Sequence, residues 1–134
     1  MSGCLFFPPL IVFEIPFFAV LLAELGYHVF ASVSQVSRLK GQASRFQQCD
    51  VVFATKGGVE VGLVFQEGGA FNLVCDEAKL EQVEGLSPIE LKNQLSQKYT
   101  HKKVYDELTK HGFSIVEEEV LEDNTVKIKV RRWI

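Results

Sequence analysis

Ser87-Pro88-Ile89-Glu90, with the amphipathic run that follows it to His111-Gly112-Phe113, decides the fold of this chain. A serine three positions before a glutamate, with proline at the first helical position, is the capping box that begins a helix. Apolar residues then recur mostly at three- and four-residue steps, which gives one apolar stripe. The stripe consists of Ile89, Leu91, Leu95, Tyr99, Val104, Tyr105 and Leu108. Because Gly112 suits the end of a helix, the stretch predicts a long helix over residues 88–111.

Two strands are predicted after this helix, over residues 113–121 and 125–133, with a turn between them. The second strand alternates branched apolar residues with basic ones, so it has one apolar face and one cationic face. Val126, Ile128 and Val130 form the first face, and Lys127, Lys129 and Arg131 the second. The acidic run Glu117-Glu118-Glu119 can lie across from these cations, where opposed charges contribute about 0.2–1 kcal/mol per pair.

Upstream of the long helix, glycine-rich turns separate short runs of strand-forming residues. The predicted strands cover residues 27–33, 50–56, 59–66 and 70–75, with turns at Gly57-Gly58 and Glu67-Gly68-Gly69. Gly62 lies inside one of these strands, which indicates either a bulge or a close backbone approach. Residues 34–48 are predicted to be a loop, and the acidic residues 76–85 a linker.

The chain is almost wholly apolar from Cys4 to Leu25, with Glu14 as the only charge. Three hypotheses account for this run: a membrane-spanning helix, a targeting signal, or a buried strand followed by a short helix. Prolines interrupt the run and no basic residue precedes it, which disfavours the first two. We therefore predict a strand over residues 10–15 and a short helix from Pro16 to Gly26. Residues 1–9 are predicted to be a flexible or atypical extension.

The composition is typical of a globular domain. The chain has 134 residues, of which 47% are hydrophobic and 23% charged, and its net charge of -3 gives no electrostatic reason to expect nucleic acid. Its three cysteines include no C-x-x-C pair and are predicted to be reduced. The element order predicts a soluble α+β fold, with one domain over residues 1–134. An antiparallel sheet of about six to seven strands carries the short N-terminal helix and the long helix 88–111 on one face.

No motif for catalysis, a metal or a cofactor occurs in the sequence. The three histidines lack metal-ligand spacing, and the glycine pairs lie between predicted strands, where a phosphate-binding loop would not occur. We therefore predict no catalytic, metal or cofactor-binding residue. The best titratable cluster is Tyr99, His101 and Tyr105, since the four-residue step places His101 and Tyr105 on one helix face. This cluster suits acid–base chemistry, or simple hydrogen bonding on that face.

Two segments are candidates for contact with a partner. Arg38 and Lys40 lie in the predicted loop, and Arg131, Arg132 and Trp133 end the last strand. Arginine and tryptophan are enriched among the residues that dominate binding interfaces. The predicted interaction residues are thus Arg38, Lys40, Tyr99, His101, Tyr105, Arg131, Arg132 and Trp133.

Several short motifs along the chain occur in an order and spacing that together resemble those of one protein family. They are Leu25-Gly26-Tyr27, Lys40-Gly41-Gln42, the hairpin at Gly57-Gly58 with Gly62, Lys98-Tyr99 with Lys103-Val104, Gly112-Phe113, Glu117 to Glu119 and Arg131-Arg132-Trp133. Over about residues 17–133 the chain thereby resembles the uncharacterised family called hypothetical chloroplast open reading frame thirty-five. The resemblance implies a cyanobacterial or plastid lineage and no established catalytic residue. Two departures are the apolar opening at Gly3 to Pro9 and Asp76-Glu77-Ala78-Lys79, where the family has an aromatic-rich stretch.

The sequence therefore predicts a non-enzymatic accessory or adaptor domain that binds another protein. One alternative is a small nucleic-acid-binding domain that uses Arg38, Lys40, Lys127, Lys129 and Arg131. Another is an enzyme with a site at His101 and its neighbouring tyrosines. The predicted location is the cytoplasm of a cyanobacterium or other bacterium, or the plastid stroma.

Overall fold

The computed structural model describes residues 2–8, 10, 13–30, 46, 48–68, 70–123 and 125–132. The chain divides into two compact units: Met1–Leu10 with Leu95–Ile134, and Ile11–Gln94. Within the described residues, seven strands form two antiparallel sheets, accompanied by helices α1, α4 and α5. The α+β class and the antiparallel pairing are confirmed, but the strands divide between two sheets instead of forming one. The prediction of a single domain over residues 1–134 stays a prediction.

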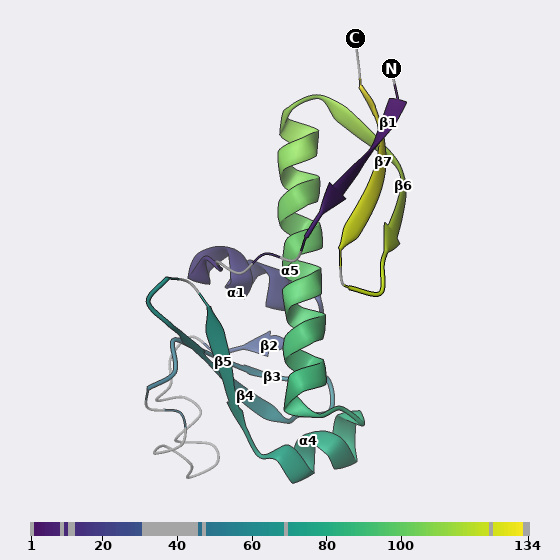
Figure 1. The fold of residues 1–134 in the computed structure, drawn as a ribbon. Helices are drawn as coiled ribbons and strands as arrows, with labels where there is room; N and C mark the ends of the chain where they lie inside the picture. The colour runs from purple at the N-terminus through teal and green to yellow at the C-terminus, as the bar shows by residue number, and fades with distance from the viewer. Residues whose placement is uncertain are drawn as a thin grey trace. The chain divides into compact units, whose positions relative to one another are not determined.

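Three strands form the sheet of the first unit, in the order β1-β7-β6 (Figure 1). β1 is Ser2–Phe7, β6 is Phe113–Val120 and β7 is Val126–Arg132, and both pairings are antiparallel. Helix α5, Pro88–Lys110, continues into this unit from Leu95 onward. The long helix and the closing hairpin are confirmed, with ends within about one residue of those predicted where the structure describes them.

The N-terminal prediction is wrong in its strand. Residues 1–9 were expected to be an extension and residues 10–15 a strand, whereas Ser2–Phe7 form β1. Leu10, Phe13 and Glu14 belong to no strand. The physical reason is that β7 has a second edge of backbone groups to pair, and β1 pairs with it from Ser2 to Phe7. The short helix is confirmed as α1, Ile15–Glu24, with a proline in its first turn.

The core of the first unit lies between the sheet and α5. Val126, Ile128 and Val130 of β7 are buried together with Val104 and Leu108 of the helix. Leu5 and Phe7 of β1 and Phe113 and Ile115 of β6 pack around them. The predicted alternation of β7 is therefore confirmed: its apolar residues face the helix and its basic residues face away.

The capping box at the start of α5 is present, with one difference. The Glu90 amide donates to the Ser87 hydroxyl at 3.2 Å, as the sequence predicts. The Glu90 carboxylate accepts from that same hydroxyl at 3.1 Å, where a bond to the Ser87 amide was expected. At the other end, Gly112 has φ +81°, the left-handed conformation that ends a helix. Local chemistry thus sets both ends of α5.

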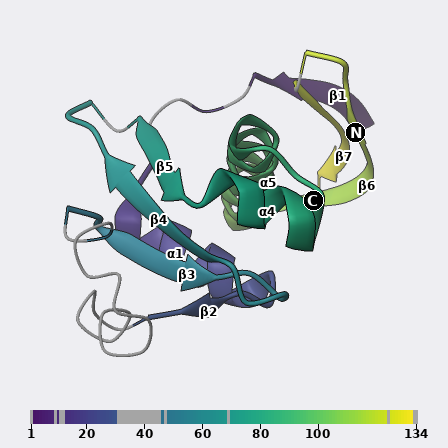
Figure 2. The ribbon, with the colours of Figure 1, turned by 90° about the horizontal axis from the view of Figure 1, so that it is seen from below.

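Four strands form the sheet of the second unit, in the order β2-β3-β4-β5 (Figure 2). They are His28–Val29, Val51–Ala54, Glu60–Phe65 and Phe71–Cys75. The predicted meander is confirmed, while residues 31–45 and 47 of the predicted first strand and loop lie outside the described residues. Phe13 and Phe18 pack edge-on against Phe71, with ring centroids 4.8 and 5.1 Å apart. Helix α1 is thereby attached to this sheet through aromatic contacts.

Gly62 lies in regular pairing in β4, opposite Val52 on one side and Val74 on the other. The predicted bulge is therefore not observed, and the nearest atoms that approach this position belong to side chains, where an approach of backbone was predicted. A Cβ atom at Gly62 would lie 2.3 Å from Cys49 Sγ and 2.9 Å from Phe46 Cδ1. Phe46 and Cys49 are buried with Val52, so glycine leaves the space that this small core occupies.

The predicted linker after β5 is wrong, because Glu77–Glu84 form helix α4. Asp76 caps the helix by accepting from the Lys79 amide at 3.1 Å, and Gly85 ends it in the left-handed conformation. Glu84 has a structural role: its Oε1 accepts from the Thr55 hydroxyl at 2.7 Å and from the Gly57 amide at 2.9 Å. The acidic composition thus reflects capping and turn contacts. Within the described residues, no helix is long and apolar enough to cross a bilayer.

Candidate functional site

His101, Tyr105 and Glu118 form one polar cluster on the helix-facing side of the first unit's sheet. The His101 and Tyr105 rings lie against each other, with centroids 4.2 Å apart, one helical turn apart on α5. Glu118 of β6 contacts His101 Nε2 through its carboxylate. The same carboxylate accepts a hydrogen bond from the Tyr105 hydroxyl. The Glu118 carboxylate therefore contacts both predicted residues, His101 and Tyr105, and connects them to β6.

The cluster is only partly sheltered from solvent. The side chains of His101 and Glu118 are 33% and 42% exposed. Burial first, then the hydrogen bond that Tyr105 donates to Glu118 and the negative charge of Glu118, raise the pKa of Tyr105 to about 12. The phenol is therefore protonated at neutral pH and serves as a donor to Glu118.

Tyr99 does not belong to this cluster, although the sequence groups it with His101. Its side chain is 1% exposed and lies among the largest buried residues of the chain. The reason is helical geometry: residues two positions apart point to different sides of a helix. Glu118, in contrast, was not singled out by sequence, because it is the middle member of a charge run that looks uniformly solvated.

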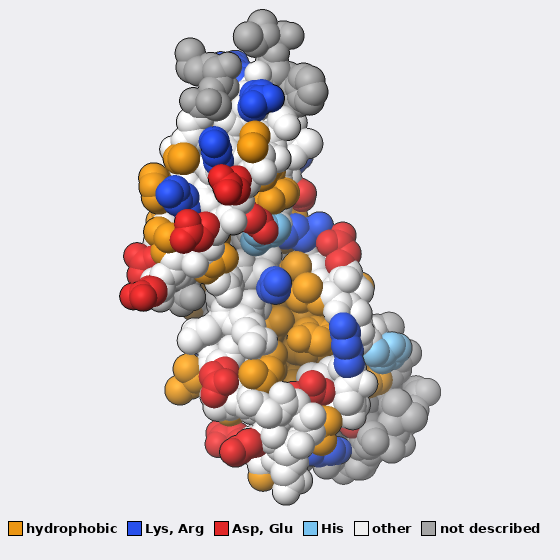
Figure 3. All heavy atoms as spheres, turned by 90° about the vertical axis from the view of Figure 1, so that its right-hand side faces the viewer, with side chains coloured by type: hydrophobic (Ala, Val, Ile, Leu, Met, Phe, Trp, Pro, Cys, Tyr) orange, Lys and Arg blue, Asp and Glu red, His pale blue; other side chains and the backbone are white. Residues whose placement is uncertain are grey.

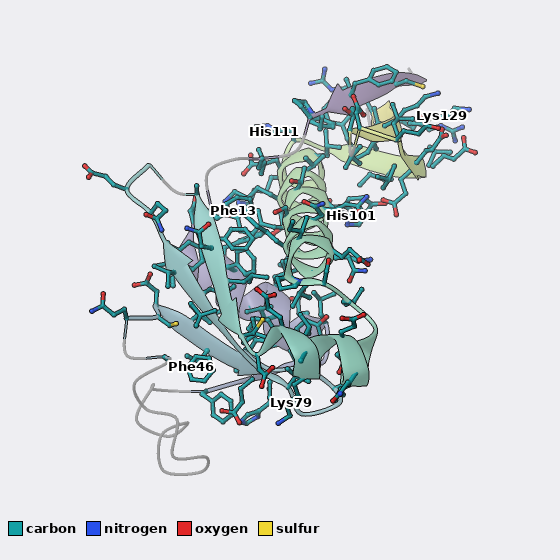
Figure 4. The ribbon with its side chains drawn as sticks, turned by 60° about the horizontal axis from the view of Figure 1, so that its bottom comes forward. Phe13, Phe46, Lys79, His101, His111 and Lys129 are labelled. Atoms are coloured by element: carbon teal, nitrogen blue, oxygen red, sulfur yellow. The ribbon has the colours of Figure 1, made fainter. Side chains whose placement is uncertain are left out.

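The open face is the side of the β1-β7-β6 sheet away from α5. It carries Cys4 and Phe6 from β1, Glu117 and Glu119 from β6, and Lys127, Lys129 and Arg131 from β7. Figure 3 looks onto basic and acidic side chains that alternate on this part of the molecule, and Figure 4 shows Lys129 pointing away from α5. Cys4, Lys127 and Lys129 with residues Glu117 to Glu119 line an open depression of about 500 Å³.

The charges of the open face are arranged in register. Glu117 lies opposite Lys129 and Glu119 opposite Lys127, which confirms the predicted cross-strand arrangement for these two residues, whereas Glu118 lies opposite Ile128. In the described part of the chain, none of the four side chains in these two opposed pairs forms an ion pair with a nitrogen–oxygen distance within 4.0 Å. Opposite charges near each other but not in contact leave this face close to neutral. Lys127 Nζ lies 5.9 Å from the centroid of the Phe6 ring on the same face.

Arg131 differs from the two lysines of its strand. Its register partners are Ser2 and Ser114, and neither residue is charged. Arg131 is exposed, and in the described part of the chain no carboxylate pairs with it. Arg132 is exposed too, with its guanidinium 5.7 Å from the centroid of the Phe113 ring.

Three of the predicted interaction residues cannot be placed in either the polar cluster or the open face. Arg38, Lys40 and Trp133 lie outside the described residues. Over the described ranges, no group of three or more histidine, cysteine, aspartate or glutamate side chains could hold a metal ion. The predicted set thus resolves into the His101 and Tyr105 cluster, the buried Tyr99, and the exposed Arg131 and Arg132.

Replacing Tyr105 with phenylalanine is expected to change how stability depends on alkaline pH. The pKa of Tyr105 is about 12 in the folded chain, against about 10 for an unfolded tyrosine. The protonated phenol therefore favours the folded state; this contribution is complete below about pH 10 and disappears as pH rises through about 12. Melting curves of both proteins across this range, compared at each pH, isolate the contribution of Tyr105. Parallel profiles for the two proteins would contradict the assignment.

The fold is of the α+β class, with two antiparallel sheets over the described residues. The chain belongs to the family described as "Protein of unknown function (DUF1257)", which it matches over residues 21–129. It is 29% identical over 98 residues to the "Uncharacterized protein ycf35" of Cyanophora paradoxa, covering 73% of this chain and 72% of that protein. The predicted resemblance is thereby confirmed. No solved structure matches the chain.

Proposed function

We propose that this chain is a non-enzymatic accessory domain that binds another protein through the Arg131 end of its open face. The single observation that carries the proposal is the contrast along β7: Lys127 and Lys129 have carboxylates opposite them, whereas Arg131 has none. An exposed guanidinium without a carboxylate opposite it offers paired donors to a carboxylate of another molecule.

The expected partner presents a carboxylate on a protein surface. Glu117 and Glu119 lie one strand away from the cations of the open face, so an extended phosphate backbone laid across this face would meet acidic side chains as well as basic ones. A single carboxylate placed at Arg131 avoids that repulsion. These charges favour a protein over the nucleic-acid alternative.

The His101, Tyr105 and Glu118 cluster supports a structural role better than an enzymatic one. Its carboxylate already accepts from both neighbouring side chains, which joins α5 to β6. The location proposed for this binding, the cytoplasm of a bacterium or the plastid stroma, draws support from the similarity to the ycf35 protein of Cyanophora paradoxa.

The test is affinity capture from the native cell extract with the wild-type chain and matched variants. Arg131→Gln is expected to weaken capture about tenfold or more, as loss of an interface hot spot does, and Arg131→Lys to retain part of it because the charge remains. Lys79→Gln, which neutralises an exposed cation on α4, is the control and is expected to have no effect.

Specific proteins that depend on Arg131 and not on Lys79 support the proposal. Captured proteins that remain with Arg131→Gln would show that the assignment of this surface is wrong. Captured RNA that dissociates steeply as salt rises would replace it with the nucleic-acid alternative.

A further inference from the structure

The two edges of the β1-β7-β6 sheet are protected to very different degrees. β6, at one edge, carries Glu117, Glu118 and Glu119 and contains an irregularity in register between Ile115 and Glu117. Charges and bulges of this kind prevent an edge strand from pairing with another molecule. β1, at the other edge, has the sequence SGCLFF and contains no charge, proline or register shift.

The outer edge of β1 is unpaired in the described part of the chain, where β7 is its one strand neighbour. Its backbone N–H and C=O groups on that side form a row that another strand can complete. Phe6 adds apolar surface next to this row, since its side chain is 58% exposed. Lys127 Nζ lies 5.9 Å from the centroid of this ring. The chemistry of the edge therefore suits another strand as occupant.

We infer that two copies of this chain pair through β1, antiparallel, to make one continuous six-stranded sheet in the order β6-β7-β1-β1-β7-β6. Residues opposite each other in an antiparallel pair lie on the same face. A pairing centred on Leu5 meets this condition. It places Cys4 opposite Phe6 of the second copy on one face, and Gly3 opposite Phe7 of the second copy on the other face. The strand is thus complementary to itself, and both copies of α5 lie on the same side of the joined sheet.

The space beside Gly3 supports this pairing. A Cβ atom at Gly3 would have no neighbouring atom within 4 Å. Phe7 of the second copy lies on the same face and across from this gap, and an aromatic ring opposite a glycine is a recurring cross-strand arrangement in sheets. The contact covers exposed glycine backbone that the single chain leaves open.

Charge also selects this edge for self-pairing. The two β7 strands, with their rows of cations, would be three strand spacings apart, or roughly 14 Å, which exceeds the screening length of about 8 Å at physiological salt. Pairing of two β6 edges would instead oppose two acidic runs. The β1 edge is therefore the side of this sheet on which a second copy meets no like charge.

The pairing is expected to be weak, because a six-residue strand buries little surface. Sedimentation across a concentration series is expected to show a reversible shift from the 15.1 kDa chain to twice that mass. The double variant Cys4→Glu/Phe6→Glu makes the β1 edge acidic like the β6 edge. Within one chain the new carboxylates lie opposite Lys129 and Lys127, so the fold is supported while the dissociation constant is expected to rise at least tenfold.

Two controls isolate the edge. Val116→Glu makes the same kind of change at an exposed position of β6 and is expected to leave the mass unchanged. Arg131→Gln is expected to stay dimeric, which separates self-pairing from the partner binding proposed above. Hydrogen exchange of the wild-type β1 amides, faster on dilution, reports the pairing without any variant.

Wild-type protein that stays monomeric at every concentration, with β1 exchange unaffected by dilution, would overturn the inference. So would a dimer that persists in the folded Cys4→Glu/Phe6→Glu variant, since the contact would then lie elsewhere. Dimerisation lost with Val116→Glu and retained with the β1 variant would move the interface to β6.

Discussion

Gly62→Ala is expected to lower the free energy of unfolding by about 2–3 kcal/mol, in the range found when a methyl group is forced into a packed core. Its new Cβ atom would lie 2.3 Å from Cys49 Sγ and 2.9 Å from Phe46, both buried. Either β4 moves or these side chains leave their positions. Urea unfolding followed by circular dichroism measures the loss.

Gly3→Ala is the matched control for this prediction. Gly3 also lies in a strand, but its added methyl group would meet no atom within 4 Å. It is expected to be neutral or slightly stabilising, because alanine loses less backbone entropy than glycine on folding. Equal effects of the two substitutions would mean that the cost at Gly62 does not come from crowding.

The double variant Gly62→Ala/Cys49→Ala tests the mechanism directly. Removing Sγ eliminates the shortest contact, although Cys49 Cβ would remain 3.2 Å from the new methyl group. The double variant is therefore expected to be more stable than the sum of the two single losses predicts, with a coupling energy of about 1 kcal/mol. Strict additivity would place the strain elsewhere in β4.

Ile128→Ala is expected to cost about 3–4 kcal/mol, within the range for truncating a fully buried isoleucine. Ile128 is 0% exposed and lies in the middle strand, between Leu5 of β1 and Glu118 of β6. Its side chain packs in the core of the first unit with Val104 and Leu108. The cavity that alanine leaves is bounded on several sides, so the surroundings relax only in part.

Lys129→Ala separates this packing effect from a general weakening of β7. Lys129 is the next residue of the same strand, faces away from α5 and is exposed. Its truncation is expected to change the unfolding free energy by less than about 0.5 kcal/mol. A comparable loss at both positions would contradict the division of β7 into a core face and an open face.

Much of the fold could be predicted because it depends on local chemistry. The Ser87 and Glu90 capping box, the glycine that ends α5 and the alternation of β7 each act within a few residues, and the structure confirms them. The N-terminal strand could not be predicted in the same way. Ser2–Phe7 become a strand because β7, more than a hundred residues later, offers an edge to pair with.

The candidate site was predicted in part for the same reason. The four-residue step between His101 and Tyr105 is a property of any helix, and it brings the rings together as expected. Tyr99 was grouped with them by proximity in sequence, although it is buried. Glu118 was missed because nothing in the run Glu117-Glu118-Glu119 distinguishes its middle residue.

What the sequence by itself determined is the set of elements from α5 onward and the apolar side of β7, since capping and periodicity are local. What only the tertiary structure decided is which glutamate faces which side. Unbroken alternation from Ile115, which packs in the core, would turn Glu117 and Glu119 toward α5. The register shift between Ile115 and Glu117 reverses this order, so that Glu118 meets His101 and its neighbours meet the lysines. One extra residue in an edge strand exchanges its faces, and its position is defined only by the pairing of β6 with β7.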